Sequence, residues 1–303
     1  MFHLIDFAAK VRWRKRFQHN PILVKIQDKL AVKDYAAQFG VKSAKVFYKT
    51  KNPEAIPFDS LPENCFIKAN HGCGWNIMRL NGRFYHFKNG SSIVDETGRY
   101  REKELKEHEI IKAEVIGKCK KWLNSKYDVS EWAYSHIDPR IYVEELITQT
   151  DETDIFDYRF FTFNGKVACY GIGSPAMRKN MENVFFDASG IEIQLTRYAE
   201  KVPDSLPPKP DFLNQMIEAA NKLGKGIDFV RIDFFCNDHD FYLAEMTVYP
   251  QSGDRNTPTS CPEFNHWLAG HWKMKNSDLL MAIIWRVYGS IKFWLEKRKL
   301  LSH

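Results

Sequence analysis

The sequence predicts an α+β fold built around antiparallel hairpins. Several segments place apolar residues at helical spacing, while short apolar runs are joined by Asn-Gly pairs, a strong signal for a two-residue hairpin turn. The composition is that of a globular protein, because 44% of the 303 residues are hydrophobic and 27% are charged, which excludes a disordered or collagen-like chain. A chain of this length is expected to form about two domains.

The first half of the chain is predicted to begin with a helix and to continue with extended segments. Gly40 stands where a C-terminal cap of a helix is expected, and Asn81-Gly82 is typical of a tight hairpin turn. In chain order, we expect a helix over 22–39, strands over 65–69 and 75–80 with a loop over 70–74 between them, a helical region over 101–124, and a buried strand over 140–147 with two acids.

Two predicted hairpins dominate the second half. The first turns at Asn164-Gly165, and the second turns at residues 237–240, where Asn and Asp are favoured. In chain order, we expect strands over 157–163, 166–172 and 184–186, a helix over 212–223, and paired strands over 227–236 and 241–249.

The formal net charge of +6 conceals an uneven distribution. Residues 1–60 carry 12 Lys/Arg against 5 Asp/Glu, and residues 273–303 carry 7 against 2, so the 212 residues between them sum to −6. Basic ends around an acidic middle indicate an anionic surface or substrate at the ends. Nucleic-acid binding is not expected, because no recognisable module accompanies the basic ends.

Cysteine usage and the terminal segments indicate a cytoplasmic protein. The six cysteines show no CxxC pair or zinc-finger spacing, and the N-terminus lacks the apolar run of a signal peptide. The apolar stretch 279–295 contains Arg286 and Lys292, so it is too short and too charged to span a membrane. Residues 279–299 instead resemble a basic amphipathic helix at the inner membrane surface; a terminal helix packed on the core is the alternative.

The hairpin over 227–249 carries the clearest chemical signal. Because side chains alternate along a strand, Arg231 and Asp233 share one face, as do Glu245 and Thr247 on the partner strand. Their neighbours are apolar, and charges beside a core are costly unless a metal or ligand compensates them. Carboxylate and hydroxyl oxygens suit Mg²⁺, which also retains water or phosphate. The alternative is an ion cluster on a solvent-facing sheet.

Two further features are weaker when taken alone. Lys68 lies near the end of a predicted strand, just before a loop that contains Gly72 and Gly74, and such a loop can cover phosphates with its free N–H groups. A solvated lysine beside an ordinary hairpin is the alternative. The two acids of the strand over 140–147 can equally be surface residues.

Taken together and in this order, these features resemble the TupA-like branch of the ATP-grasp superfamily, which is associated with teichuronopeptide and surface-polysaccharide synthesis. The resemblance covers roughly residues 22–255. The matching blocks are D-K at 28–29, L-P at 61–62, F-I-K-A-N-H-G-C-G at 66–74, R-I-Y-V-E-E-L-I at 140–147, D-Y-R-F at 157–160, F-V-R-I-D-F-F at 229–235 and A-E-M-T-V-Y-P-Q-S-G at 244–253.

The resemblance implies roles for the matching positions. Residues 144–147 would form the hinge that holds adenine, residues 72–74 would cover the phosphates, and His71 would be either a loop residue or a proton acceptor from an amine. The implied catalytic residues are Arg231, Arg178 and Lys68; the metal ligands are Asp233, Glu245 and Thr247; the ATP-binding residues are Lys29, Lys68, His71, Gly72, Gly74, Glu144, Glu145, Leu146, Ile147 and Asp151.

Two positions depart from the pattern of the family. Thr247 stands where the wider superfamily has Asn as a further metal ligand, which leaves the number of metal ions open. Arg159 stands where D-Y-K is common in the branch, which leaves the role of this position open.

An ATP-grasp fold with two α+β lobes gripping ATP is the fold that the resemblance implies. The implied activity is that of a carboxylate–amine ligase, in which the γ-phosphate of ATP passes to a carboxylate and an amine then displaces phosphate from the acyl phosphate. ATP and Mg²⁺ are the expected cofactors, and no nucleophilic side chain is required. A glycan or uronic-acid acceptor and an amine donor are the expected partners, so that a surface-polysaccharide precursor is decorated.

Four segments are expected along the chain. No full pre-ATP-grasp domain fits ahead of residue 28, so part of the acceptor site is expected from the C-terminal segment or from a partner. The segments are a basic helical N-terminal segment over 1–62, a small lobe with the Gly loop over 63–145, a large lobe with the metal site over 146–255, and a basic amphipathic C-terminal extension over 256–303.

Three other functions compete with the ligase. A glycan kinase would use the same fold to phosphorylate a hydroxyl group. A glycosyltransferase is suggested by Asp238-His239-Asp240, which mimics a D-x-D metal motif, although a hairpin turn explains this triplet better. A nucleotide-binding scaffold with a degenerate site is suggested by Thr247.

Overall fold

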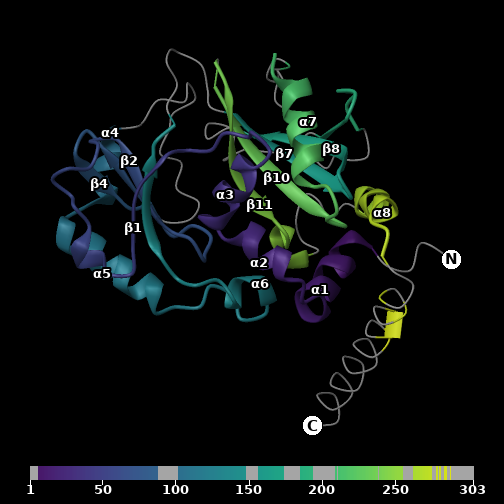
Figure 1. Ribbon diagram of the computed structural model, residues 1–303, viewed down its shortest axis with the longest axis horizontal. Coiled ribbons are helices and arrows are strands. Elements are labelled where there is room, and N and C mark those ends of the chain that lie inside the picture. Colours follow the sequence, from purple (N-terminus) through teal and green to yellow (C-terminus); the bar gives the residue numbers. More distant parts are fainter. Residues whose placement is uncertain are drawn as a thin grey trace, which may run out of the picture.

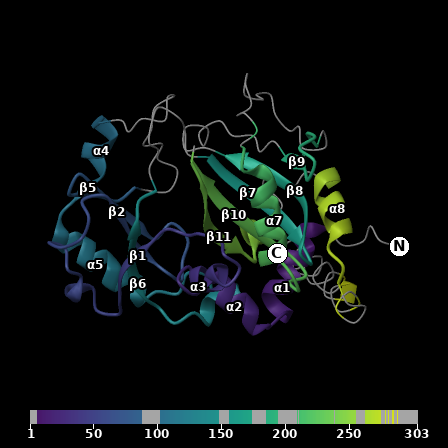
Figure 2. The ribbon, with the colours of Figure 1, turned by 45° about the horizontal axis from the view of Figure 1, so that its top comes forward.

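The computed structural model describes residues 6–87, 102–147, 156–173, 185–193, 209, 211–237, 239–254 and 262–274, together with scattered residues between 278 and 287. These residues form two antiparallel sheets in two lobes. Two short helices, α2 (Pro21–Gln27) and α3 (Ala31–Ala37), lie between the sheets (Figures 1 and 2). The α+β class predicted from the sequence is confirmed.

The first lobe contains a six-stranded sheet with the strand order β1-β6-β2-β3-β4-β5, in which all neighbouring strands are antiparallel. Asn81 and Gly82 both have positive φ angles, as the predicted turn between β3 and β4 requires. The strands are β1 (Val46–Thr50), β2 (Cys65–Ala69), β3 (Asn76–Leu80), β4 (Arg83–Tyr85), β5 (Glu109–Ile110) and β6 (Ile141–Glu145).

One face of this sheet forms the core of the first lobe. Ile67 on β2 and Val143 on β6 are fully buried and belong to one apolar cluster with Val115 of α5 (Lys112–Leu123). Because side chains alternate along a strand, the neighbouring polar residues, Lys68 among them, point to the opposite face. That opposite face is turned toward the second lobe (Figure 1).

The helical region predicted over 101–124 is interrupted. It consists of α4 (Glu102–His108), the short strand β5, and α5. A new helix starts at residue 112 because the side chain of Glu114 accepts a hydrogen bond from the backbone N–H of Ile111 at 3.0 Å, which satisfies a donor at the helix N-terminus.

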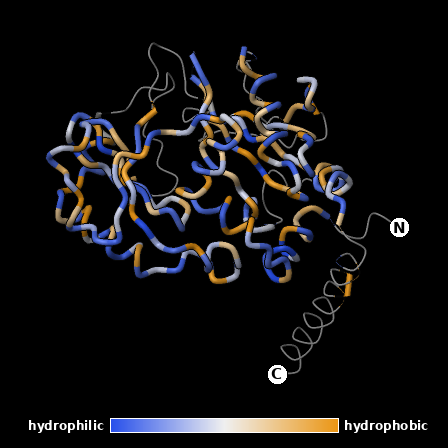
Figure 3. Tube along the Cα trace, in the orientation of Figure 1, coloured by the Kyte–Doolittle hydropathy of each residue, from blue (hydrophilic) through white to orange (hydrophobic). Residues whose placement is uncertain are grey.

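The second lobe contains a five-stranded sheet with the order β11-β10-β7-β8-β9. Helices α7 and α3 contact this sheet, and a large apolar cluster joins the sheet to them. Figure 3 shows hydrophobic residues along the strands of this lobe. Asn164 and Gly165 have positive φ angles, as predicted for the β7–β8 turn. The elements are β7 (Phe156–Phe163), β8 (Lys166–Gly173), β9 (Phe185–Asp187), β10 (Val230–Cys236), β11 (Phe241–Thr247) and α7 (Leu213–Leu223).

Two short helices replace the single helix predicted over 22–39. They are α2 (Pro21–Gln27) and α3 (Ala31–Ala37). Asp28 causes the break, because its Oδ1 accepts hydrogen bonds from the backbone N–H groups of Leu30 (2.8 Å) and Ala31 (3.3 Å) and so begins a new helix. Lys29 consequently lies in the linker between the two helices.

The basic residues of α1 (Phe7–Phe17) are used inside the fold. Lys10 donates to the carbonyl oxygens of Ala269 (2.7 Å) and Trp272 (2.5 Å), next to α8 (Pro262–His271). Arg14 is fully buried and lies 2.5 Å from the Asp228 carboxylate. Part of the N-terminal positive charge predicted to meet an anionic surface, that of Lys10 and Arg14, is therefore bound within the protein.

The predicted segment boundaries can be compared with the lobes. Strand β1 lies before the division expected at residue 62 and pairs with β6 beyond it, so this sheet takes strands from both sides of that division.

The stretch 279–299, predicted to be amphipathic, lies almost entirely outside the described residues. Among the described residues, no helix is long and apolar enough to cross a membrane. The remaining short helices are η1 (Pro53–Ala55), α6 (Trp132–Ser135) and η4 (Pro250–Gly253).

Candidate functional site

A β-bulge aligns the polar residues of the β10–β11 hairpin. Phe234 pairs with Leu243, but Asp233 pairs with Glu245, so Ala244 is an extra residue on β11. This insertion reverses the alternation of side chains along β11 and places Glu245 on the same face as Asp233. The next polar pair, Arg231 opposite Thr247, follows in the same register. The convergence expected for these four residues is confirmed.

The four side chains form one ion network with Lys29. The guanidinium of Arg231 donates from Nε to Asp233 Oδ1 (2.8 Å) and from Nη2 to Asp233 Oδ2 (2.5 Å), and Nη2 also reaches Thr247 Oγ1 (3.2 Å). Lys29 Nζ donates to Glu245 Oε2 at 2.8 Å. Two cations therefore hold the two carboxylates that are predicted to bind metal.

Each of the two acids in this network has a cation beside it that favours its charged form. Burial raises the pKa of Asp233, the neighbouring carboxylates of Glu245 and Asp157 add to the rise, and the paired guanidinium of Arg231 opposes it. The ammonium of Lys29 holds the pKa of Glu245 well below its usual range. A divalent cation would provide the same compensation more strongly.

The donor set fits a magnesium ion with an incomplete protein shell. Two carboxylates and one hydroxyl lie together, and within the described residues no group of three or more His, Cys, Asp or Glu side chains is arranged to hold a metal. Mg²⁺ is commonly bound by one or two carboxylates with water and substrate phosphates as its other ligands. The residues present therefore suit a metal that arrives with a phosphate compound.

A second polar group lies on the inner face of the first lobe. Glu144 on β6 is 5% exposed, and its two carboxylate oxygens are held by two different lysines. Lys68 Nζ lies 2.5 Å from Oε1, and Lys33 Nζ lies 2.7 Å from Oε2. Burial would raise the pKa of Glu144, but the two ammonium groups outweigh it and lower the pKa to about 2. The carboxylate is thus a fixed anion between two cations.

The glycine loop after β2 is shaped by an aromatic side chain. A Cβ atom at Gly72 would lie 2.5 Å from the ring of Trp75, and Gly74 has a φ angle of +70°, so both positions favour glycine. His71 is 3% exposed, and its ring nitrogens lie 3.2 Å from Asn70 Oδ1 and 3.0 Å from the carbonyl oxygen of Trp122. This histidine therefore anchors the base of the loop.

The predicted hinge follows β6 directly. Glu145 is exposed, and its backbone N–H donates to the carbonyl of Lys45 at 2.9 Å. Leu146 is buried and Ile147 is half-buried. Asp151 and Arg178, two further predicted site residues, lie outside the described residues.

Arg159 lies beside the metal-site acids on the next strand. It pairs with Asp233 across β7 and β10, and its guanidinium donates to Asp157 Oδ2 from Nε (2.9 Å) and Nη2 (2.6 Å). The position left open by the sequence is thus part of an ion pair at the edge of the site.

The α2–α3 linker joins the two polar groups. Lys29 reaches Glu245 in the second lobe, while its backbone N–H donates to the carbonyl of Asn70 in the first lobe at 3.2 Å. Lys33, one helical turn later, reaches Glu144. Sequence reasoning missed Lys33, although its spacing of four residues from Lys29 was a usable signal.

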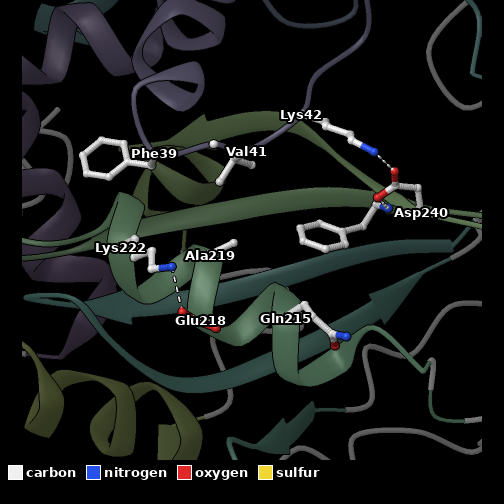
Figure 4. A pocket seen from close by; sticks show the side chains of 10 residues that line it. Phe39, Val41, Lys42, Gln215, Glu218, Ala219, Lys222 and Asp240 are labelled. Carbon is white, nitrogen blue, oxygen red and sulfur yellow. Dashed lines mark hydrogen bonds and ion pairs between the residues drawn. The ribbon is translucent and has the colours of Figure 1, made fainter.

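A separate cavity lies away from these residues. It has a volume of about 220 Å³ between the end of α3, the start of β11 and α7, and Figure 4 shows the Lys42–Asp240 and Lys222–Glu218 ion pairs at its edge. None of the predicted site residues lines it. This cavity is therefore separate from the two polar groups between the lobes.

Comparison with known proteins gives one family and several distant structures. The model of a family described as TupA-like ATPgrasp matches residues 9–271. No curated protein matches the chain. Among solved structures, D-alanine–D-alanine ligase from Bacillus anthracis with ATP has a TM-score of 0.40 at 12% identity, over 81% of this chain and 66% of that one. The Helicobacter pylori ligase gives 0.41 at 16%, over 82% and 61%. The ATP-grasp ligase PsnB with a phosphomimetic precursor variant, Mg and ADP gives 0.38 at 12%, over 81% and 59%. This chain spans less than two thirds of each of these chains.

Proposed function

This chain belongs to the TupA-like ATP-grasp family, and on this premise we propose that it is an ATP-dependent ligase that joins a carboxylate to an amine through an acyl phosphate. Family membership confirms the resemblance found in the sequence and, with it, the ATP-grasp fold. The choice of an amide product, of Mg²⁺ as the metal and of a surface-polysaccharide precursor as the substrate is our proposal.

One observation carries the proposal. Acids suited to a metal and cations suited to phosphates meet between the two lobes, with Asp233 and Glu245 on one sheet, Lys68 on the other, and Lys29 in contact with both lobes. Phosphoryl transfer depends on positioning and charge neutralisation more than on covalent chemistry by the protein. A site that contains these groups and needs no nucleophilic side chain matches that requirement.

The reaction can be followed from the residues present. Lys68 and Lys29 would neutralise the phosphates, and Arg231, held by Asp233, would face the charge that develops on the γ-phosphate. Mg²⁺ held by Asp233 and Glu245 would supply further neutralisation. A carboxylate oxygen of the acceptor attacks the γ-phosphorus and ADP leaves. The amine then attacks the acyl carbon, phosphate leaves, and an amide forms with loss of a proton from the amine.

The acceptor that we propose is a uronic acid of a surface-glycan precursor, and the donor is an amino acid. The support is the sequence resemblance to the TupA-like branch, which is associated with such polymers, together with the match of the family model over residues 9–271. Contact of residues 279–299 with the membrane surface is part of this proposal and rests on their sequence alone.

Trapping of the activated carboxylate tests the proposal. We expect wild-type protein with Mg-ATP, a uronic acid and hydroxylamine to release ADP and form a hydroxamate, because hydroxylamine intercepts an acyl phosphate. The double variant Asp233→Ala/Glu245→Ala should lose about 10³-fold or more of this activity. A matched double variant of exposed acids, Glu54→Ala/Glu218→Ala, should keep it.

Two outcomes would contradict the ligase. Normal ATP turnover in the Asp233→Ala/Glu245→Ala variant would remove the proposed site from the reaction. A phosphate ester of the sugar in place of a hydroxamate, identified by its mass, would instead establish the kinase alternative.

A further inference from the structure

Lys33 of α3 is largely buried, although it lies in none of the sequence motifs described above. Its ammonium is 2.7 Å from Glu144 Oε2, and its side chain is 12% exposed. It also donates to the carbonyl oxygen of Ala44 at 3.1 Å. An ammonium group has three N–H donors, and within the described part of the chain the third donor of Lys33 has no hydrogen-bond partner.

The carboxylate that holds Lys33 is shared. Glu144 has only two oxygens, and Lys68 occupies the other one at 2.5 Å. One negative charge therefore serves two ammonium groups, and both lysines are at least three-quarters buried, with side-chain exposures of 12% and 22%. Burying a charge without full compensation is costly, so an anion is expected beside this pair.

The two polar groups between the lobes contain several charges close together. Four cations (Lys29, Lys33, Lys68 and Arg231) lie with three acids (Glu144, Asp233 and Glu245), and Asp28 of the α2–α3 linker is a further carboxylate beside them. Burial lowers the pKa of Lys33, and the nearby charges of Lys68 and Lys29 lower it further although Glu144 opposes them, so the three lysines influence one another directly. A polyphosphate would relieve this repulsion.

We propose that Lys33 is a phosphate-binding residue of the nucleotide site, acting beside Lys68 while Glu144 anchors both lysines. This inference rests on the proposed function, because it assumes that a nucleotide binds between the lobes. It gives α3, through Lys33, a role in binding ATP beside that of Lys29 in the α2–α3 linker. If Lys33 has only a structural role and joins α3 to β6, its substitution should change the affinity for ATP no more than the affinity for adenosine.

A series of nucleotides separates these two roles. We expect the full-length variant Lys33→Met to bind Mg-ATP and Mg-ADP about tenfold or more weakly than wild type, measured by titration calorimetry, while adenosine binding changes less than about twofold. Lys33→Arg, which keeps the charge, should recover most of the affinity. Lys42→Met, which changes an exposed lysine paired with Asp240, is the matched control and should bind as wild type does.

The outcomes that overturn the proposal differ from those that overturn the ligase. If wild type binds Mg-ATP but Lys33→Met binds it equally well, or loses adenosine and ATP affinity alike, Lys33 does not bind phosphate. If wild type binds no nucleotide, the proposed function itself fails.

A measurement on the wild-type protein covers the case in which Lys33→Met does not fold. Saturating Mg-ATP, but not adenosine, should slow acylation of Lys33 by an amine-reactive reagent about fivefold or more, as followed by mass spectrometry. Unchanged labelling of Lys33 in the presence of Mg-ATP would contradict the proposal.

Discussion

Two groups of buried or half-buried cations lie in this protein, and they differ in the acceptors that hold them. The α1 group consists of Lys10, Arg12, Arg14 and Lys15, and the inter-lobe group consists of Lys29, Lys33, Lys68 and Arg231. Carbonyl oxygens of the main chain accept hydrogen bonds from every member of the α1 group, and Arg14 and Lys15 also lie within ion-pair distance of carboxylates. Each member of the inter-lobe group is paired with a side-chain carboxylate, and Lys33 also donates to the carbonyl oxygen of Ala44.

The difference indicates which group serves the fold and which serves a ligand. A main-chain carbonyl is fixed by secondary structure, so a cation bound to it, such as Arg14 on the carbonyl of Phe229 (2.7 Å), joins parts of the fold. A carboxylate that is shared, as Glu144 is, or that is also suited to a metal, as Glu245 is, leaves its cation able to interact with phosphate. Burial of positive charge alone does not distinguish the two cases, and neither does a carboxylate partner, because Arg14 also pairs with Asp228. The distinguishing feature is that the carboxylates between the lobes are shared between cations or suited to a metal.

The largest expected effect on stability comes from the α1 group. We expect Arg14→Met to lower the free energy of unfolding by about 3–5 kcal/mol, because it leaves Asp228 and two carbonyl groups without their fully buried partner. Chemical denaturation followed by circular dichroism measures this change. Mg-ATP affinity of the folded fraction should stay near that of wild type.

A neighbouring residue provides the control for this comparison. Arg16→Met changes an exposed cation on the same helix and should alter stability by less than about 0.5 kcal/mol. Equal losses in the Arg14 and Arg16 variants would show that helix charge, rather than the buried contacts, determines the effect.

A smaller, pH-dependent effect is expected beside the α1 group. Burial raises the pKa of Glu131 to about 7, and Lys15, 4.0 Å away, only partly opposes the rise. Below pH 4.5 this carboxyl group is protonated in both the folded and the unfolded chain, so it does not change the free energy of unfolding. As the pH rises through about 7, the folded state loses stability, because it must hold a charge that burial disfavours.

Glu131→Gln removes that charge and tests the sign of the effect. We expect this variant to be about 2 kcal/mol more stable than wild type at pH 8 and nearly equal to it at pH 4.5, as measured by denaturation at several pH values. Asp138→Asn, at an exposed acid, should show no such gain at pH 8. A Glu131→Gln variant that is less stable than wild type at pH 8 would contradict the account.

The sequence predicted much of the local structure and the acids of the site. The Asn-Gly turns and the grouping of Arg231 with Asp233 follow from short-range rules of strand alternation and turn chemistry. The alignment of Glu245 with Asp233 did not follow from those rules, because it depends on the bulge at Ala244. A bulge is fixed by how two strands pair, which a pattern within one strand does not reveal.

Long-range contacts account for the other differences. Lys33 meets Glu144, which is 111 residues away in the sequence, so neither residue alone indicated the pair. The cations of α1 looked like a basic extension because their carbonyl partners, such as that of Ala269, appear only once α1 packs beside α8. The break between α2 and α3 depends on Asp28, whose side chain competes with the helical pattern of its apolar neighbours.

The central claim is that the inter-lobe group binds the phosphates of ATP while the α1 group holds the fold together. The most direct test is the affinity of the Lys68→Met variant for Mg-ATP, measured by titration calorimetry on protein shown to be folded. The account predicts an affinity about tenfold or more below that of wild type, with the free energy of unfolding changed by less than about 1 kcal/mol. An unchanged affinity for Mg-ATP would contradict it.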